Sequence, residues 1–74
     1  MKIPNDIDIP VSEWERLIDE WILGDKQREI LKLNLIHQNT YFEIGEKVGM
    51  SERQIARIIP PLENRLFEKA RKYL

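Results

Sequence analysis

Two arginines, Arg53 and Arg57, have the side chains and the spacing with the clearest chemical meaning. They are four residues apart, so on a helix they lie one turn apart on the same face. A guanidinium group can donate two hydrogen bonds to one guanine in the major groove of DNA. The apolar residues Ile55 and Ile58 take the inward positions and leave the arginines outward. The pair therefore indicates a helix face suited to the base edges of DNA.

Other polar residues suit contacts to an anion. Ser51 is a candidate helix cap whose hydroxyl could also reach a phosphate. Helix starts and nearby basic residues favour anions, which makes phosphate contact the expected role of five more residues: Thr40, Tyr41, Lys47, Lys26 and Arg28. For Arg28, an ion pair with Asp25, three residues back on the same face, is an equal alternative.

The sequence contains no set of residues arranged for catalysis. His37 is the only histidine, there is no cysteine, and no nucleophile or phosphate loop accompanies it. Asp6 and Asp8 lack the third acid, the glycine and the distal glutamate of a calcium loop. We therefore expect no enzymatic activity, no cofactor and no metal ion.

The spacing of apolar residues predicts an all-α fold, a small bundle of four to five helices. Capping boxes predict three helix starts, at Ser12 with Glu15, Thr40 with Glu43, and Ser51 with Gln54. Asp25 is the expected cap of a further helix, and Gly24 is expected to end the helix before it. The expected core consists of Trp14, Ile18, Trp21, Leu31, Ile44, Val48, Ile55, Ile58, Leu62 and Leu66.

Pro60 and Pro61 interrupt the last apolar stripe, which continues in phase across them. Each proline removes a backbone donor and clashes with the preceding helical turn, at about 3 kcal/mol in a helix interior. We therefore expect a break, with Pro61 near the first turn of a fifth helix, and a kinked continuous helix is the alternative.

Residues 40–59 have the pattern of a helix-turn-helix. Gly45 stands where the second helix must cross the first closely, and Gly49 stands where the turn needs a positive φ. Five apolar residues occupy the inward positions: Ile44, Val48, Met50, Ile55 and Ile58. The two glycines, the Ser51 cap and the apolar set together are more specific than a random amphipathic helix pair.

Residues 25–59 resemble the fourth conserved region of bacterial sigma factors, through the Gln27-Arg28-Glu29 opening, the 40–45 helix start and Gly49-Met50-Ser51. The whole chain is more similar to small sigma-like transcription regulators of phages and mobile elements in Gram-positive bacteria. This resemblance implies that helix 51–59 lies in the major groove of double-stranded DNA, with four residues at the bases: Glu52, Arg53, Ala56 and Arg57. It also implies RNA polymerase as a second partner. Two departures from the family pattern are Gly45, where alanine is usual, and the proline pair.

Charge is distributed unevenly along the chain. The net charge is −1, but residues 1–25 carry two basic and seven acidic side chains, and residues 26–74 carry ten basic and six acidic ones. An acidic front and a basic back indicate that only one face meets a polyanion. The absence of cysteine and of a long apolar run predicts a cytoplasmic protein that does not cross a membrane.

We expect residues 1–10 to form an extended N-terminal arm, because Pro4 and Pro10 disfavour a helix, and residues 11–74 to form a single helical DNA-binding domain. Two other functions stay open. The same helices could form a protein-interaction module that docks RNA polymerase or another protein, or a helical bundle, designed or degenerate, with no partner.

Overall fold

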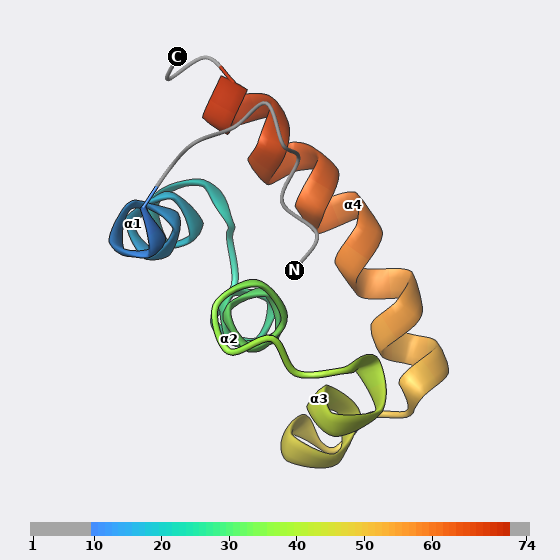
Figure 1. Ribbon diagram of the computed structural model, residues 1–74. Coiled ribbons are helices and arrows are strands. Elements are labelled where there is room, and N and C mark those ends of the chain that lie inside the picture. The colour runs from blue at the N-terminus through green and yellow to red at the C-terminus, as the bar shows by residue number, and fades with distance from the viewer. Residues whose placement is uncertain (1–9, 72–74) are drawn as a thin grey trace.

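The computed structural model describes residues 10–71, which form four helices and contain no strand (Figure 1). The helices are α1 (Val11–Trp21), α2 (Asp25–Leu35), α3 (Tyr41–Val48) and α4 (Glu52–Arg71). The predicted all-α bundle is confirmed. The predicted N-terminal arm, apart from Pro10, and Tyr73 at the predicted end of the last helix lie outside the described residues.

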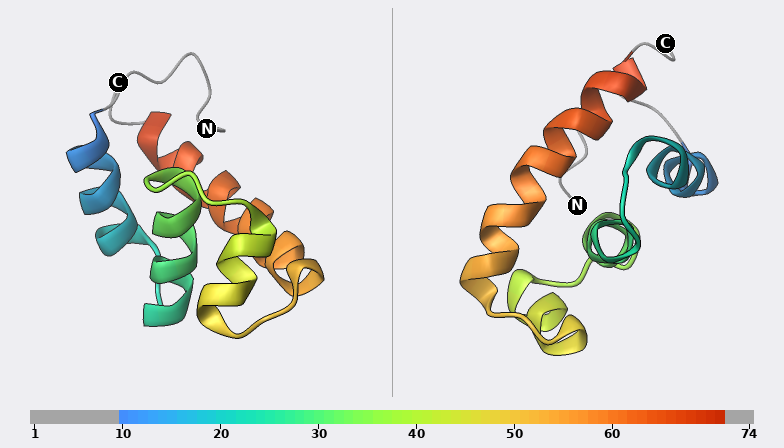
Figure 2. Two further views of the ribbon diagram at one scale, coloured as in Figure 1. Left: turned by 60° about the horizontal axis from the view of Figure 1, so that its bottom comes forward. Right: turned by 180° about the vertical axis from the view of Figure 1, so that it is seen from behind.

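The long helix α4 joins the bundle together. It packs against each of the other three helices, and α2 packs against α1 and α3. In the left view of Figure 2, α1, α2 and α3 follow one another across the molecule, while α4 runs diagonally past α2 and α3. The core lies between these two layers, and Trp14 of α1 meets Phe67 of α4 there edge to face, with ring centroids 5.7 Å apart.

Most of the predicted core is confirmed. Six of the ten residues are buried, namely Trp14, Ile18, Leu31, Ile44, Ile55 and Leu66. Three more, Val48, Ile58 and Leu62, are partly buried and pack against the core.

The prediction of Trp21 as a core residue was wrong, because its side chain is 39% exposed. Helix α1 ends at Trp21, and Ile22 follows in an extended conformation with its side chain fully buried. The chain therefore leaves the helical period at the point where the pattern would have placed Trp21 inside. The Lys69 ammonium lies over the Trp21 ring, 4.6 Å from the ring centroid.

Two predicted helix starts were also wrong. The cap of α1 is Pro10, whose carbonyl accepts hydrogen bonds from the backbone N–H groups of Glu13 and Trp14. Proline suits a helix start because its missing N–H would have no partner there. The cap of α2 is Gly24, at φ 92°, rather than Asp25, which is the first residue of that helix. An acidic side chain in the first turn still interacts favourably with the helix dipole.

The predicted break at Pro60-Pro61 and the fifth helix were wrong, because α4 runs continuously from Glu52 to Arg71 with both prolines inside it. Both prolines are exposed, so their rings do not disturb the core. A single helix keeps the buried residues on one stripe on either side of the prolines: Ile55, Ile59, Leu66 and Ala70. Burying side chains of this size stabilises by roughly 1.5–3 kcal/mol for each large one, which offsets the cost of the prolines.

Candidate functional site

The segment between α3 and α4 is a three-residue turn, residues 49–51. Gly49 has φ 74°, the left-handed conformation that the sequence predicts for it. The backbone N–H groups of Gly49 and Met50 both donate to the Gly45 carbonyl, the second at 2.9 Å. The first two residues of the turn are thus tied to the middle of α3.

Gly45 is buried, and the space beside it is filled by backbone rather than by side chains. A Cβ atom at this position would meet the Met50 carbonyl oxygen, with the Ser51 carbonyl carbon 3.4 Å away. The close approach predicted at Gly45 is therefore present, but the turn makes it and not the second helix itself.

The starts of α3 and α4 are both held by the capping boxes that the sequence predicts. Thr40 Oγ1 accepts from the Glu43 N–H at 3.1 Å, and the Thr40 N–H donates to the Glu43 carboxylate at 2.8 Å. Ser51 and Gln54 exchange the equivalent pair at 3.1 and 2.9 Å. Each box satisfies donors that a helix start leaves unpaired.

The same hydrogen bonds act on the charge of Glu43. The backbone N–H of Thr40 lowers the pKa of Glu43 below its ordinary value, and the Thr40 side chain and the Lys47 charge act in the same direction. The first turn of α3 therefore holds a carboxylate that stays ionised under mildly acidic conditions.

The four residues expected at the bases occupy the first two turns of α4. Glu52, Arg53, Ala56 and Arg57 are all exposed, while Ile55 between them is fully buried. Within residues 10–71, neither arginine forms a hydrogen bond or an ion pair with another side chain. Both guanidinium groups are therefore available to a partner.

The residues expected at phosphates fall into separate groups. Thr40 and Ser51 are the capping residues described above, and Tyr41 is half-buried against the core. Lys47 is exposed in the last turn of α3 and forms no hydrogen bond or ion pair with the described part of the chain.

Lys26 and Arg28 have partners inside the protein. Lys26 Nζ donates to the Val48 carbonyl at 3.4 Å, close to the end of α3. Arg28 Nε donates to the Ile22 carbonyl at 2.8 Å, and its Nη1 lies 3.2 Å from Asp25 Oδ1. The ion pair weighed as an alternative for Arg28 is thus present. The hollow that Arg28 lines contains residues of α1, α2 and His37 only, so Arg28 does not lie beside the four residues expected at the bases.

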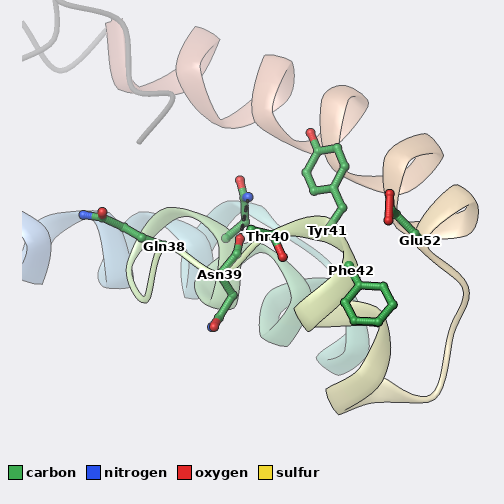
Figure 3. A pocket seen from close by; sticks show the side chains of 7 residues that line it. Gln38, Asn39, Thr40, Tyr41, Phe42 and Glu52 are labelled. Atoms are coloured by element: carbon green, nitrogen blue, oxygen red, sulfur yellow. Dashed lines mark hydrogen bonds between the residues drawn. The ribbon is translucent and has the colours of Figure 1, made fainter.

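Two hollows adjoin the start of α4. The first, of about 360 Å³, is lined by Asn34, Gln38, Asn39, Thr40, Tyr41, Phe42 and Glu52 (Figure 3). The second, of about 390 Å³, is lined by Phe42, Gly45, Glu46, Gly49, Met50, Ser51 and Glu52. Phe42 and Glu52 belong to both.

Sequence reasoning gave no role to Phe42, whose side chain is 58% exposed. Its position off the apolar stripe formed by Tyr41, Ile44 and Val48 was the available signal. The amides of the first hollow were also missed, and Gln38, at φ 56°, has the left-handed backbone that turns the chain there.

Two further properties concern the described residues alone. No group of three or more histidine, cysteine or acidic side chains in residues 10–71 could hold a metal ion. No helix in the same range has the length and apolar character needed to cross a membrane. Comparison of the chain with models of known families, with curated proteins and with solved structures finds no match.

Proposed function

We propose that this chain is a sequence-specific DNA-binding transcription regulator of the sigma region 4 type, with the start of α4 in the major groove. The observation that carries the proposal is the state of Arg53 and Arg57. They are exposed one turn apart, they have no partner within residues 10–71, and they lie on the face opposite to the buried Ile55.

The shape of this surface supports the proposal. A major groove about 12 Å wide admits one helix, whose N-terminal residues approach the base edges. The turn at residues 49–51 and the Ser51–Gln54 capping box hold the N-terminal end of α4 at the surface. Arginine there suits guanine, and the Glu52 carboxylate suits the amine of cytosine.

Electrostatics set a limit on the strength of binding. Lys47 is the exposed base next to the turn, but Glu43, Glu46 and Glu52 are exposed nearby. Each phosphate contact contributes about −0.9 to the slope of log affinity against log salt concentration. Because few bases are free here, we expect a modest slope and a specificity that depends mainly on the base-facing residues.

Fluorescence anisotropy tests the proposal, with a duplex selected from a random library, a random duplex and a salt series. Arg53→Ala and Arg57→Ala should each weaken binding to the selected duplex by about 1–3 kcal/mol and change binding to the random duplex much less. Lys47→Ala should weaken both alike and lower the salt slope by about one unit.

Arg65→Ala is the matched control, since Arg65 is an exposed arginine on the same helix without a partner in the described part. It lies ~18 Å along the helix axis from Arg53, so its loss should leave both affinities unchanged. If Arg53→Ala and Arg57→Ala both bind every duplex as the parent does, the proposal is refuted.

A specific observation favours a second candidate, a protein-interaction module that docks RNA polymerase or another protein. The exposed apolar side chains Val11, Trp21 and Leu23 accompany the acidic residues of α1, away from the start of α4. A shallow salt slope without preference for any duplex, together with binding to purified polymerase, would favour this function.

For both candidate functions, we propose that the chain is a cytoplasmic, non-enzymatic protein of phage or mobile-element type. This proposal rests on the resemblance stated above.

A further inference from the structure

Phe42 is a large apolar residue on a face of α3 that the other described helices do not cover. The apolar stripe of α3 consists of Tyr41 and Val48, which are half-buried, and Ile44, which is fully buried. Phe42 lies off this stripe and is 58% exposed. Figure 3 shows the Tyr41 ring directed toward α4 and the Phe42 ring directed away from it. The ring is therefore free to contact a partner.

The position of Phe42 associates it with the base-facing residues. Phe42 and Glu52 line both hollows beside the start of α4. The second hollow also contains Gly49 and Met50 of the turn. The ring therefore stands between two depressions of the same surface, next to the first residue of α4.

The chemistry of the ring selects one class of contact in DNA. Phenylalanine has no donor or acceptor for a phosphate, and the adjacent Glu52 carboxylate repels one. The major groove offers a single apolar group, the 5-methyl group of thymine, which apolar side chains recognise. Burying one methyl group in this way is worth about fourfold in affinity.

We propose that Phe42 is a specificity-determining residue that contacts a thymine methyl group in the base pair adjacent to the one that Glu52 faces. The inference rests on the proposed function, because it needs the start of α4 in the major groove. It adds a base contact from α3 to the four residues of α4 that are expected at the bases, and it predicts the position of the contacted thymine in the DNA site.

Uracil substitution tests the contact, because uracil differs from thymine only in lacking the methyl group. Each thymine of the selected duplex is replaced in turn, and affinity is measured by anisotropy for the parent and for Phe42→Ala. The parent should lose about fourfold at one thymine, and Phe42→Ala should show no loss there. That thymine should lie next to the base pair whose preference Glu52→Gln reduces.

Ala56→Ser is the matched control, because Ala56 is the other apolar residue on the exposed face of the first two turns of α4. It should abolish sensitivity at a different thymine and leave the Phe42-dependent one unchanged. Thermal unfolding followed by circular dichroism should give the same midpoint for Phe42→Ala as for the parent, since the ring is largely outside the core.

The outcomes separate this inference from the proposed function. If the parent selects a duplex but Phe42→Ala keeps the full uracil pattern, or loses affinity equally for thymine and uracil duplexes, only the Phe42 contact is overturned. If the selected site has no thymine beside the Glu52-dependent base pair, the contact is also overturned. If the parent binds no duplex selectively, the proposed function and the contact both fail.

Discussion

Replacing Pro60 and Pro61 together by alanine should stabilise the protein. Both prolines lie inside α4 and both are exposed, so the change leaves no cavity in the core. Alanine at these positions supplies the N–H groups that proline lacks, and these can donate to the carbonyls of Ala56 and Arg57, four residues earlier.

The magnitude follows from opposing contributions. Each proline costs about 3 kcal/mol relative to alanine in a helix interior, and this figure already includes the lost hydrogen bond. Alanine also frees the unfolded chain, which costs about 0.4–1 kcal/mol per site. Because α4 runs continuously through both prolines, we expect only part of the interior cost to be recovered, a net gain of about 2–4 kcal/mol for the double variant. That corresponds to a melting temperature higher by at least ~8 °C in a domain of this size.

Urea unfolding followed by circular dichroism measures this gain, and hydrogen exchange should show two newly protected amides at positions 60 and 61. Pro10→Ala is the control, since Pro10 precedes the first turn of α1 and no helical N–H is missing there. It should change stability little. A double variant that is no more stable than the parent would refute the reasoning, because the prolines would then hold a bend that the packing of Leu66 and Phe67 requires.

Three other changes test the core, the turn and the capping box. Ile55→Ala should cost about 2–5 kcal/mol in urea unfolding, most of the stability of a domain this small, and an unchanged midpoint would exclude Ile55 from the core. Gly45→Ala should destabilise the protein by about 1–2 kcal/mol, because the added Cβ forces the Met50 carbonyl to move. This is the net effect after the gain of about 1 kcal/mol from the higher helix propensity of alanine. Equal stability of the variant and the parent would show that the turn can move without cost. Glu43→Gln should flatten the acid side of the stability profile. Because folding lowers the pKa of Glu43, the ionised carboxylate stabilises the protein at pH values above its ordinary pKa of 4.5, and this stabilisation is lost as the pH falls through the folded-state pKa. An unaltered pH profile of stability in the variant would contradict a role for the Glu43 charge.

The helix starts show where local sequence patterns suffice. The boxes at Thr40 and Ser51 each follow a non-helical segment, and both form as the sequence predicts. Ser12 belongs to an equally good pattern, yet α1 begins one residue before it because Pro10 already provides the cap. Which of two neighbouring residues caps a helix depends on the path by which the chain enters that helix. A short sequence motif carries no information on this path.

In the candidate site, too, the sequence predicts some features and not others. The exposure of Arg53 and Arg57 follows from the period of the apolar residues alone. The partners of Lys26 and Arg28 do not, because Lys26 reaches a carbonyl 22 residues away, at the end of another helix. Contacts between a long side chain and a distant backbone carbonyl depend on tertiary packing, so sequence could only offer these bases as candidates for an outside anion.

The continuity of α4 has a consequence for the proposed binding surface. Its first turns carry Arg53 and Arg57, and its last turns are anchored in the core, where Phe67 meets Trp14 of α1. A break at the prolines would have separated the segment that carries the arginines from the anchoring of these last turns. As one helix, α4 transmits the packing of α1 and α2 to the exposed face, so the direction of that face depends on the whole bundle.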